Sequence, residues 1–284
     1  MKNALTVDVE DFYQVSAFEP FIARSQWEDY PQRVEFGTKL ILEKLSEKKI
    51  LGTFFILGWV ARKFPQLIRE IASWGHEIGF HSGEHQLLYR LTPETFREDL
   101  RRGKKNLEDL TGQEVAAFRA PSFSVTTESL WAFDVLVEEG FRYDSSLFPI
   151  HHDRYGIPDA PITIHPVETP SGTLWEFPPS VVRLGKWNFP VSGGGYFRLY
   201  PYALSRFCLK KVNRSRPFVF YIHPWELDPE QPVLPFGSRM TQFRHRVGLR
   251  KNALKLERLL RDFTFGKLSE VIENEKATRT MTSD

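Results

Sequence analysis

The sequence predicts an α/β fold, a distorted parallel barrel in which strands and helices alternate. Over the first 145 residues, short apolar runs of strand length alternate with amphipathic helical patterns. Five of the apolar runs in the chain are each followed by an ionisable residue. A barrel gathers the carboxyl ends of its strands around one point, so it is favoured over an open sheet. The residues at these ends are Asp8, His81, Arg119, Asp144 and His223.

The elements of the first half follow from apolar spacing and from residues that begin or end helices. Thr92 is expected to cap a helix whose first residue is Pro93. Gly112 and Gly140 are expected to end two helices. Strands are expected at 4–7, 52–57, 77–80, 115–118 and 141–143, and helices at 33–47, 64–74, 93–111 and 127–139.

The second half changes rhythm, because Pro, Gly and aromatic residues are frequent between 150 and 200. We interpret this stretch as a loop-rich insertion between late barrel strands. A helix at 202–212 and a strand at 218–222 restore the alternation, and helices are expected near 249–262 and 266–273. The predicted organisation is a barrel, residues 1–227, and a helical C-terminal extension, residues 228–284, that packs on the barrel and frays after about residue 275.

Composition excludes several classes of protein. The 284 residues are 41% apolar, which suffices for one large core. The net charge of +2, from 38 basic and 36 acidic residues, indicates no nucleic-acid partner. A single cysteine, Cys208, rules out an intrachain disulfide. We find neither a signal segment nor a membrane span and therefore expect a cytoplasmic protein; the sequence does not specify its oligomeric state.

Two histidines indicate a metal site. His81 and His85 stand four residues apart after a strand, and an acidic residue from the first strand could complete a three-ligand site. Strand alternation places Glu10 on the same side as Asp8, whereas Asp11 could reach the metal only if the chain bends. Glu10 is the preferred third ligand, and Asp11 is the alternative. Zinc is the favoured cation, with Co²⁺, Ni²⁺ and Mn²⁺ as alternatives.

Five short motifs occur in one order along the chain. They are Thr6-Val7-Asp8-Val9-Glu10-Asp11, His81-Ser82-Gly83-Glu84-His85, Arg119-Ala120-Pro121-Ser122-Phe123, Tyr143-Asp144-Ser145-Ser146 and Ile222-His223. This order resembles the polysaccharide deacetylase family of metal-dependent carbohydrate esterases. Two positions depart from it, since Val9 stands where the family has its metal-binding Asp, and Pro224 where many relatives carry Asp. The stretches 193–198 and 223–226 look like a subgroup associated with exopolysaccharide synthesis.

The resemblance implies a seven-stranded, TIM-like barrel and a role for each motif. Asp8 would be the general base, and His223 would be the general acid on the opposite side of the barrel mouth. Arg119 would pair with Asp8 and keep it ionised. Asp144 would orient either Arg119 or His223, and the backbone N–H near Phe123 would stabilise the oxyanion.

The implied activity is removal of N-acetyl groups from an N-acetylhexosamine-containing polysaccharide, oligosaccharide or lipid-linked precursor. Phe123, Tyr196 and Trp225 are the expected substrate-binding residues. One alternative is an amidohydrolase that acts on a small cyclic amide or ureide, because the His-Pro form of the last motif also occurs in such relatives. The other alternative is a catalytically inactive glycan-binding module. An open groove lined by aromatics would favour a sugar, and a closed polar pocket a small molecule.

Overall fold

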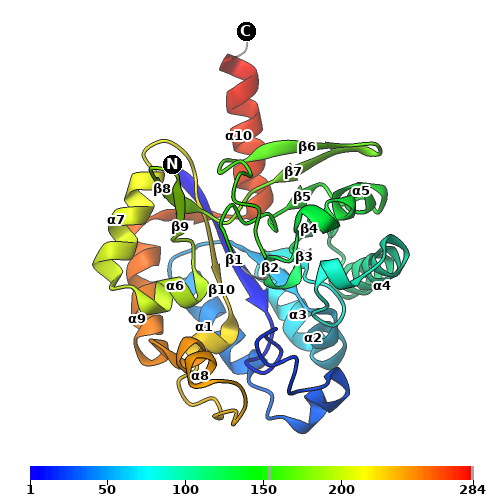
Figure 1. Ribbon diagram of the computed structural model, residues 1–284, viewed down its shortest axis with the longest axis vertical. Helices are drawn as coiled ribbons and strands as arrows, with labels where there is room; N and C mark the ends of the chain where they lie inside the picture. The colour runs from blue at the N-terminus through cyan, green and yellow to red at the C-terminus, as the bar shows by residue number, and fades with distance from the viewer. Residues whose placement is uncertain (153–154, 283–284) are drawn as a thin grey trace.

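The structure, a computed structural model, describes residues 1–152 and 155–282. Its centre is a nine-stranded sheet in the order β10-β1-β2-β3-β4-β5-β7-β6, with β11 paired to β1. Seven of these strands, from β10 to β7 in that order, are parallel to their neighbours, and β6 returns antiparallel. Helices surround the curved sheet (Figure 1). The predicted α/β fold, a distorted parallel barrel, is confirmed.

The strands and helices have the following bounds. The strands are β1 Lys2–Val9, β2 Thr53–Ile56, β3 Glu77–Phe80, β4 Ala117–Phe118, β5 Tyr143–Asp144, β6 His165–Thr169, β7 Gly172–Glu176, β8 Val181–Leu184, β9 Trp187–Pro190, β10 Val219–Ile222 and β11 Thr264–Gly266. The helices are α1 Val34–Glu47, α2 Gly58–Lys63, α3 Pro65–Ser73, α4 Pro93–Thr111, α5 Trp131–Glu138, α6 Gly194–Leu199, α7 Tyr202–Val212, α8 Arg239–Arg246, α9 Leu249–Asp262 and α10 Leu268–Thr282.

Successive side chains of a strand point to opposite faces of the sheet, one toward the surrounding helices and one into the barrel. Leu5, Val7 and Val9 of β1 belong to the main core, which also contains the apolar faces of the surrounding helices. Ala4 belongs to a second cluster with residues of other barrel strands, and Asp8 follows it on the same side of β1. The polar residues of the motifs therefore point into the barrel at the carboxyl ends of the strands.

Helix α10 covers the opposite, amino-terminal end of the barrel. Its Leu268, Val271 and Ile272 are buried in the second cluster with inward-facing strand residues. The backbone N–H of Leu268 also donates to the Thr53 hydroxyl over 2.7 Å. The rest of α10 extends away from the sheet (Figure 1). With this end closed by apolar side chains, the barrel is accessible from the end that carries the ionisable residues.

The segment between β7 and β10 contains the strands β8 and β9, which pair with each other and not with the central sheet. Backbone N–H groups of β10 donate to the Ser180 hydroxyl, over 3.1 Å from Val219, and to the Ser192 carbonyl, over 2.8 Å from Tyr221. Gly193 then forms a parallel bridge with Tyr221, so close that a Cβ atom would lie 1.9 Å from the Tyr221 carbonyl oxygen, and its φ is 142°. Only glycine fits this position.

Several local predictions are wrong. The stretch 150–200 is more than an insertion, because β7 within it pairs in parallel with β5 of the central sheet. The helix predicted at 266–273 begins at Leu268 after the short strand β11, and it continues to Thr282 where fraying was expected. Helices α2 and α8 were not predicted. Among the described residues, no helix has the length and apolar character required to cross a bilayer.

Candidate active site and metal centre

Glu10, His81 and His85 form one buried group. One ligand atom from each residue lies within 4.8 Å of those of the other two. His85 Nε2 is 2.8 Å from Glu10 Oε2. The loop between the histidines has two non-glycine residues in the left-handed region, Ser82 at φ 63° and His85 at φ 53°. This unusual backbone shape directs both imidazoles toward the end of β1, as is common at functional sites.

The protonation of this group suits a divalent cation. His81 Nδ1 lies 2.8 Å from the Arg119 carbonyl oxygen, which can only accept, so Nδ1 carries the proton and Nε2 keeps its lone pair. Burial lowers the pKa of His81 to about 4, which makes this imidazole neutral at pH 7. Burial alone would raise the pKa of Glu10, but the neighbouring histidines outweigh it and lower that pKa to about 2. Two imidazoles and one carboxylate are a donor set typical of zinc.

Asp11 is not part of this group, so the alternative third ligand does not fit. Its Oδ2 accepts backbone N–H groups from Arg33 over 2.6 Å and from Val34 over 2.9 Å, and its Oδ1 accepts from Phe12 over 2.9 Å. The chain turns after Glu10, so that Asp11 ties the start of α1 to the end of β1. Both its oxygens have structural partners, whereas Glu10 Oε2 faces His85 Nε2, 2.8 Å away, within the group.

Exchanging the two carboxylates for alanine should separate their roles. We expect Asp11→Ala to lower the free energy of unfolding by about 1–3 kcal/mol, because buried N–H groups lose their acceptor, and to leave metal stoichiometry unchanged. Glu10→Ala should remove the metal with a smaller effect on stability. Denaturant unfolding and metal analysis of both variants check this, and metal loss in Asp11→Ala alone would reverse the assignment.

Asp8 and Arg119 form the expected ion pair beside this group. Arg119 Nη1 donates to Asp8 Oδ1 over 2.7 Å, and the exposure of the two residues is at most 2%. The guanidinium also donates to Thr6 Oγ1 over 2.8 Å and to the carbonyl and hydroxyl oxygens of Ser145 over 3.0 and 2.8 Å. A buried guanidinium that is fully hydrogen-bonded holds one oxygen of Asp8 in place and leaves Oδ2 directed elsewhere.

His223 faces Asp8 and Glu10 across the site. Its Nε2 lies 3.8 Å from Asp8 Oδ2 and 3.6 Å from Glu10 Oε1, and its Nδ1 lies 3.3 Å from Glu226 Oε2. Burial alone would lower the pKa of His223, but the carboxylates of Glu226, Glu10 and Asp8 outweigh it and raise that pKa to about 9. His223 therefore carries a proton at neutral pH.

Two further residues, not predicted from the sequence, support His223: Glu226 contacts it, and Arg198 in turn holds Glu226. Glu226 Oε2 accepts from the His223 backbone N–H over 3.1 Å, and Oε1 accepts from Arg198 Nε over 2.7 Å. Burial would raise the pKa of Glu226, but Arg198 and His223 lower it to about 2. The signal was present in His223-Pro224-Trp225-Glu226, since one turn of 3₁₀-helix at Pro224–Leu227 brings the carboxylate back to the histidine.

Asp144 contacts neither of its predicted partners. Its oxygens accept from the Ser146 backbone N–H over 3.0 Å and hydroxyl over 2.7 Å, and it shares a hydrogen bond with the buried Glu176. Burial and the charge of Asp144 raise the pKa of Glu176, so Glu176 is the protonated member of this pair. Ser146 Oγ in turn accepts from the Ala120 N–H over 2.8 Å. Asp144 thus braces the loop after Arg119, with a partner that the sequence did not reveal.

The three-residue metal group, Asp8, His223 and Glu226 line a cavity of about 160 Å³. Phe123 lines it, and the N–H of Phe123 itself donates to the Ala120 carbonyl over 3.0 Å. Ser122 and Phe123 both have positive φ, at 51° and 54°. The lining residues are Asp8, Glu10, Val15, Ser16, His81, His85, Ala120, Ser122, Phe123, Tyr155, Gly194, Gly195, Arg198, Tyr221, His223, Trp225 and Glu226.

The other two predicted substrate contacts differ from expectation. Trp225 lines the cavity but is only 4% exposed. It is stacked between His223, at 5.3 Å between ring centroids, and His245, at 4.5 Å. Trp225 thus supports the ring of His223 and is not an open platform for a sugar. Tyr196 does not line the cavity, and its hydroxyl meets Tyr155, which does.

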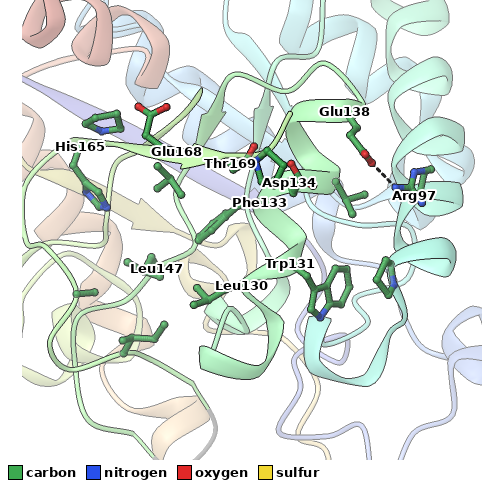
Figure 2. Close-up of a pocket in the computed structure, with 17 residues that line it drawn as sticks. Arg97, Leu130, Trp131, Phe133, Asp134, Glu138, Leu147, His165, Glu168 and Thr169 are labelled. Carbon is green, nitrogen blue, oxygen red and sulfur yellow. Dashed lines mark hydrogen bonds and ion pairs between the residues drawn. The ribbon is translucent and has the colours of Figure 1, made fainter. Parts of the chain in front are cut away.

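A larger cavity, about 790 Å³, lies between α5 and β6. Figure 2 shows Leu130, Trp131 and Phe133 along it and the Arg97–Glu138 ion pair at one side. None of the five strand-end residues lines this cavity. Because size alone does not define a catalytic site, the convergence of ionisable groups identifies the smaller cavity as the candidate active site.

Two stretches of the chain match known family models. Residues 25–136 match the polysaccharide deacetylase family model, and residues 145–273 match a domain of unknown function, DUF3473. A peptidoglycan-N-acetylglucosamine deacetylase of Bacillus cereus is 34% identical over 100 residues, 35% of this chain and 36% of that protein. A peptidoglycan-N-acetylmuramic acid deacetylase of Bacillus subtilis is 30% identical over 91 residues, which are 32% of this chain and 35% of that protein. The match thus spans only about a third of each relative.

One solved structure has the same fold over nearly the whole chain. It is described as a "putative polysaccharide deacetylase" from Mycobacterium smegmatis, with a TM-score of 0.65 and 20% identity over 98% of this chain and 91% of that one. The DUF3473 range contains Arg198, His223 and Glu226, so both matched ranges contribute to one cavity. Residues 25–136 are therefore similar to the polysaccharide deacetylase family, and the likeness to the solved structure extends over nearly the whole chain at the level of the fold.

Proposed function

We propose that this protein is a metal-dependent hydrolase that removes N-acetyl groups from an N-acetylhexosamine-containing glycan or glycan precursor. The observation that carries the proposal is that Asp8 and a protonated His223 line one cavity together with Glu10, His81 and His85. A base and an acid beside a cation site are what amide hydrolysis requires. The names of the two Bacillus relatives support the acetyl group and the sugar.

Asp8 would act as the general base. A divalent cation on Glu10, His81 and His85 would supply the Lewis acidity that activates a water molecule and polarises the acyl oxygen. Arg119 holds Asp8 Oδ1, which leaves Oδ2 to take the proton of the attacking water. His223 Nε2 lies 3.8 Å from Oδ2, so both groups border the cavity in which the substrate would lie.

His223 would protonate the leaving amine. An amine leaves poorly as an anion, so the carbon–nitrogen bond breaks more easily when nitrogen receives a proton. Glu226 would fix the ring through Nδ1 so that the Nε2 proton faces the cavity. Glu226 would thereby keep His223 protonated, and Arg198 would hold the Glu226 carboxylate through its other oxygen, Oε1.

Glu226→Gln should shift the basic limb of the pH–rate profile. The charge of Glu226 raises the pKa of His223, so its removal lowers that pKa, and activity should be lost at a lower pH than in the wild type. We expect a shift on the order of one pH unit, the scale of one charge-assisted hydrogen bond. Glu230→Gln, which changes an exposed carboxylate in the same loop, is the matched control. An unchanged limb in Glu226→Gln would remove Glu226 from the mechanism.

A second candidate is hydrolysis of a small cyclic amide or ureide. The cavity volume of about 160 Å³ favours it, because this space is below the range of most ligand pockets. An acetate-release assay on N-acetylated glycans, run beside a ring-opening assay on cyclic ureides, decides between the two. We expect acetate release and no ring opening. Glycan binding without turnover in added zinc would favour an inactive binding module instead.

A further inference from the structure

We infer that the outer face of α8, with the loop before it, docks on the surface of a bilayer that contains anionic lipids. This α8 surface consists of Phe21, Val233, Phe236, Met240 and Phe243, with the cations Arg239, Arg244, Arg246, Arg250 and Lys251 around them. The inference goes beyond the proposed function and does not depend on it.

The apolar part of the α8 surface is exposed, and two of its rings are stacked. Val233 is 63% exposed, Met240 57%, Phe243 54% and Phe21 47%. Phe21 stacks on Phe236 with ring centroids 5.9 Å apart. Gln242 of α8 ties the loop to the helix, since its Nε2 donates to the carbonyls of Leu234 and Phe236. Apolar side chains that gather in this way usually mark an interaction site.

The charge of this region is one-sided. Residues 231–251 contain five cations and no carboxylate, and residues 198–262 contain 14 Lys and Arg against five Asp and Glu. The net charge of +2 for the whole chain conceals this asymmetry. None of the five cations pairs with a carboxylate in the described part of the chain. This unbalanced positive charge favours binding to an anionic partner.

A cavity beside α8 offers room for lipid head groups. It has a volume of about 580 Å³ and is lined by Arg246, Arg250 and Lys251 as α8 gives way to α9. A phosphate group in this cavity would lie near the charges of all three side chains.

A lipid surface explains both features of the α8 surface, whereas a soluble polyanion explains only the charge. Val233 and Met240 offer no hydrogen bonds to a glycan, but aliphatic and aromatic side chains framed by arginines are typical of helices that lie in a membrane interface. The inner face of α8 carries His245, which stacks on Trp225 next to His223. Docking through α8 would therefore hold the active site close to the bilayer.

Sedimentation with vesicles tests the inference without reference to catalysis. The full chain should bind vesicles of phosphatidylcholine with phosphatidylglycerol and not vesicles of phosphatidylcholine alone. Met240→Ser/Phe243→Ser should weaken binding by at least about tenfold, because two apolar side chains no longer insert. Arg239→Gln/Arg244→Gln should weaken it by about fivefold per charge. Val233→Ser, in the loop, gives a second apolar variant if the helix variant is unstable.

The matched control is Leu204→Ser/Phe207→Ser on α7. These residues have the same spacing, are 45% and 66% exposed, and lie near Lys210 and Lys211, but they are not part of the α8 surface. Their substitution should leave vesicle binding unchanged. Three results would each overturn the inference: equal binding to both vesicle types, loss of binding in the α7 variant alone, or apolar α8 variants that bind like the wild type. In the last case, competition by dextran sulfate would identify a polyanion site.

Discussion

Replacing His81 and His85 together with alanine is expected to remove the bound cation and reduce acetate release to background. The two residues supply both imidazoles of the three-ligand group, and His81 is held in its metal-binding tautomer by the Arg119 carbonyl. Loss of an orienting neighbour alone usually costs ten- to a hundredfold in metal affinity, so loss of two ligands should cost well over about 100-fold. Metal analysis after dialysis, together with acetate release, measures both effects.

His76→Ala is the control for this experiment. His76 is also buried, but its Nδ1 accepts from the Gly52 N–H over 3.1 Å and its ring packs on Phe54, outside the cavity. Its loss should lower thermal stability and leave the metal in place. A double variant of His81 and His85 that still holds one cation per chain would show that the metal binds elsewhere.

Asp8→Asn should lower turnover by about 100-fold or more while the metal stays bound, because the base is lost and the three ligands remain. It should also lower stability, because the buried guanidinium of Arg119 loses its counter-charge. Rates at saturating substrate and metal content, measured on folded protein, separate these effects. Loss of the cation in this variant would instead make Asp8 a ligand.

The companion variant His223→Ala should depend on the leaving group. We expect it to be about 100-fold slower on an N-acetyl amide, which needs a proton on nitrogen, and much less impaired on an activated aryl ester, which does not. Equal damage on both substrates would show that His223 stabilises the oxyanion or positions the substrate.

Strand geometry explains how much of the site the sequence could predict. In parallel strands the carboxyl ends meet at one end of the barrel, so Asp8, His81, Arg119 and His223 could be expected to converge from their positions alone. Alternation along β1 favoured Glu10 over Asp11, and the structure groups Glu10 with the two histidines even though β1 ends at Val9 and the Glu10 N–H donates to the Asp8 carbonyl over 3.0 Å. The motifs then added the expected pairing of Arg119 with Asp8.

The sequence could not predict side-chain contacts that depend on how distant segments pack together. Asp144 meets Glu176 because β5 pairs with β7, and nothing local in a five-residue strand specifies that neighbour. Arg198 reaches Glu226 from a different helix. Helix α10 looks weakly amphipathic alone, but its buried Leu268 and Ile272 are explained by the open end of the barrel that they cover.

Titration of zinc into metal-stripped protein, with acetate release from an N-acetylated glycan as the readout, tests the central claim most directly. The site predicts no turnover without metal, a rise that saturates at one cation per chain, and no response from Glu10→Ala over the same range. Full turnover by the stripped protein, or a Glu10→Ala titration that matches the wild type, would contradict a metal-dependent reaction at Glu10, His81 and His85.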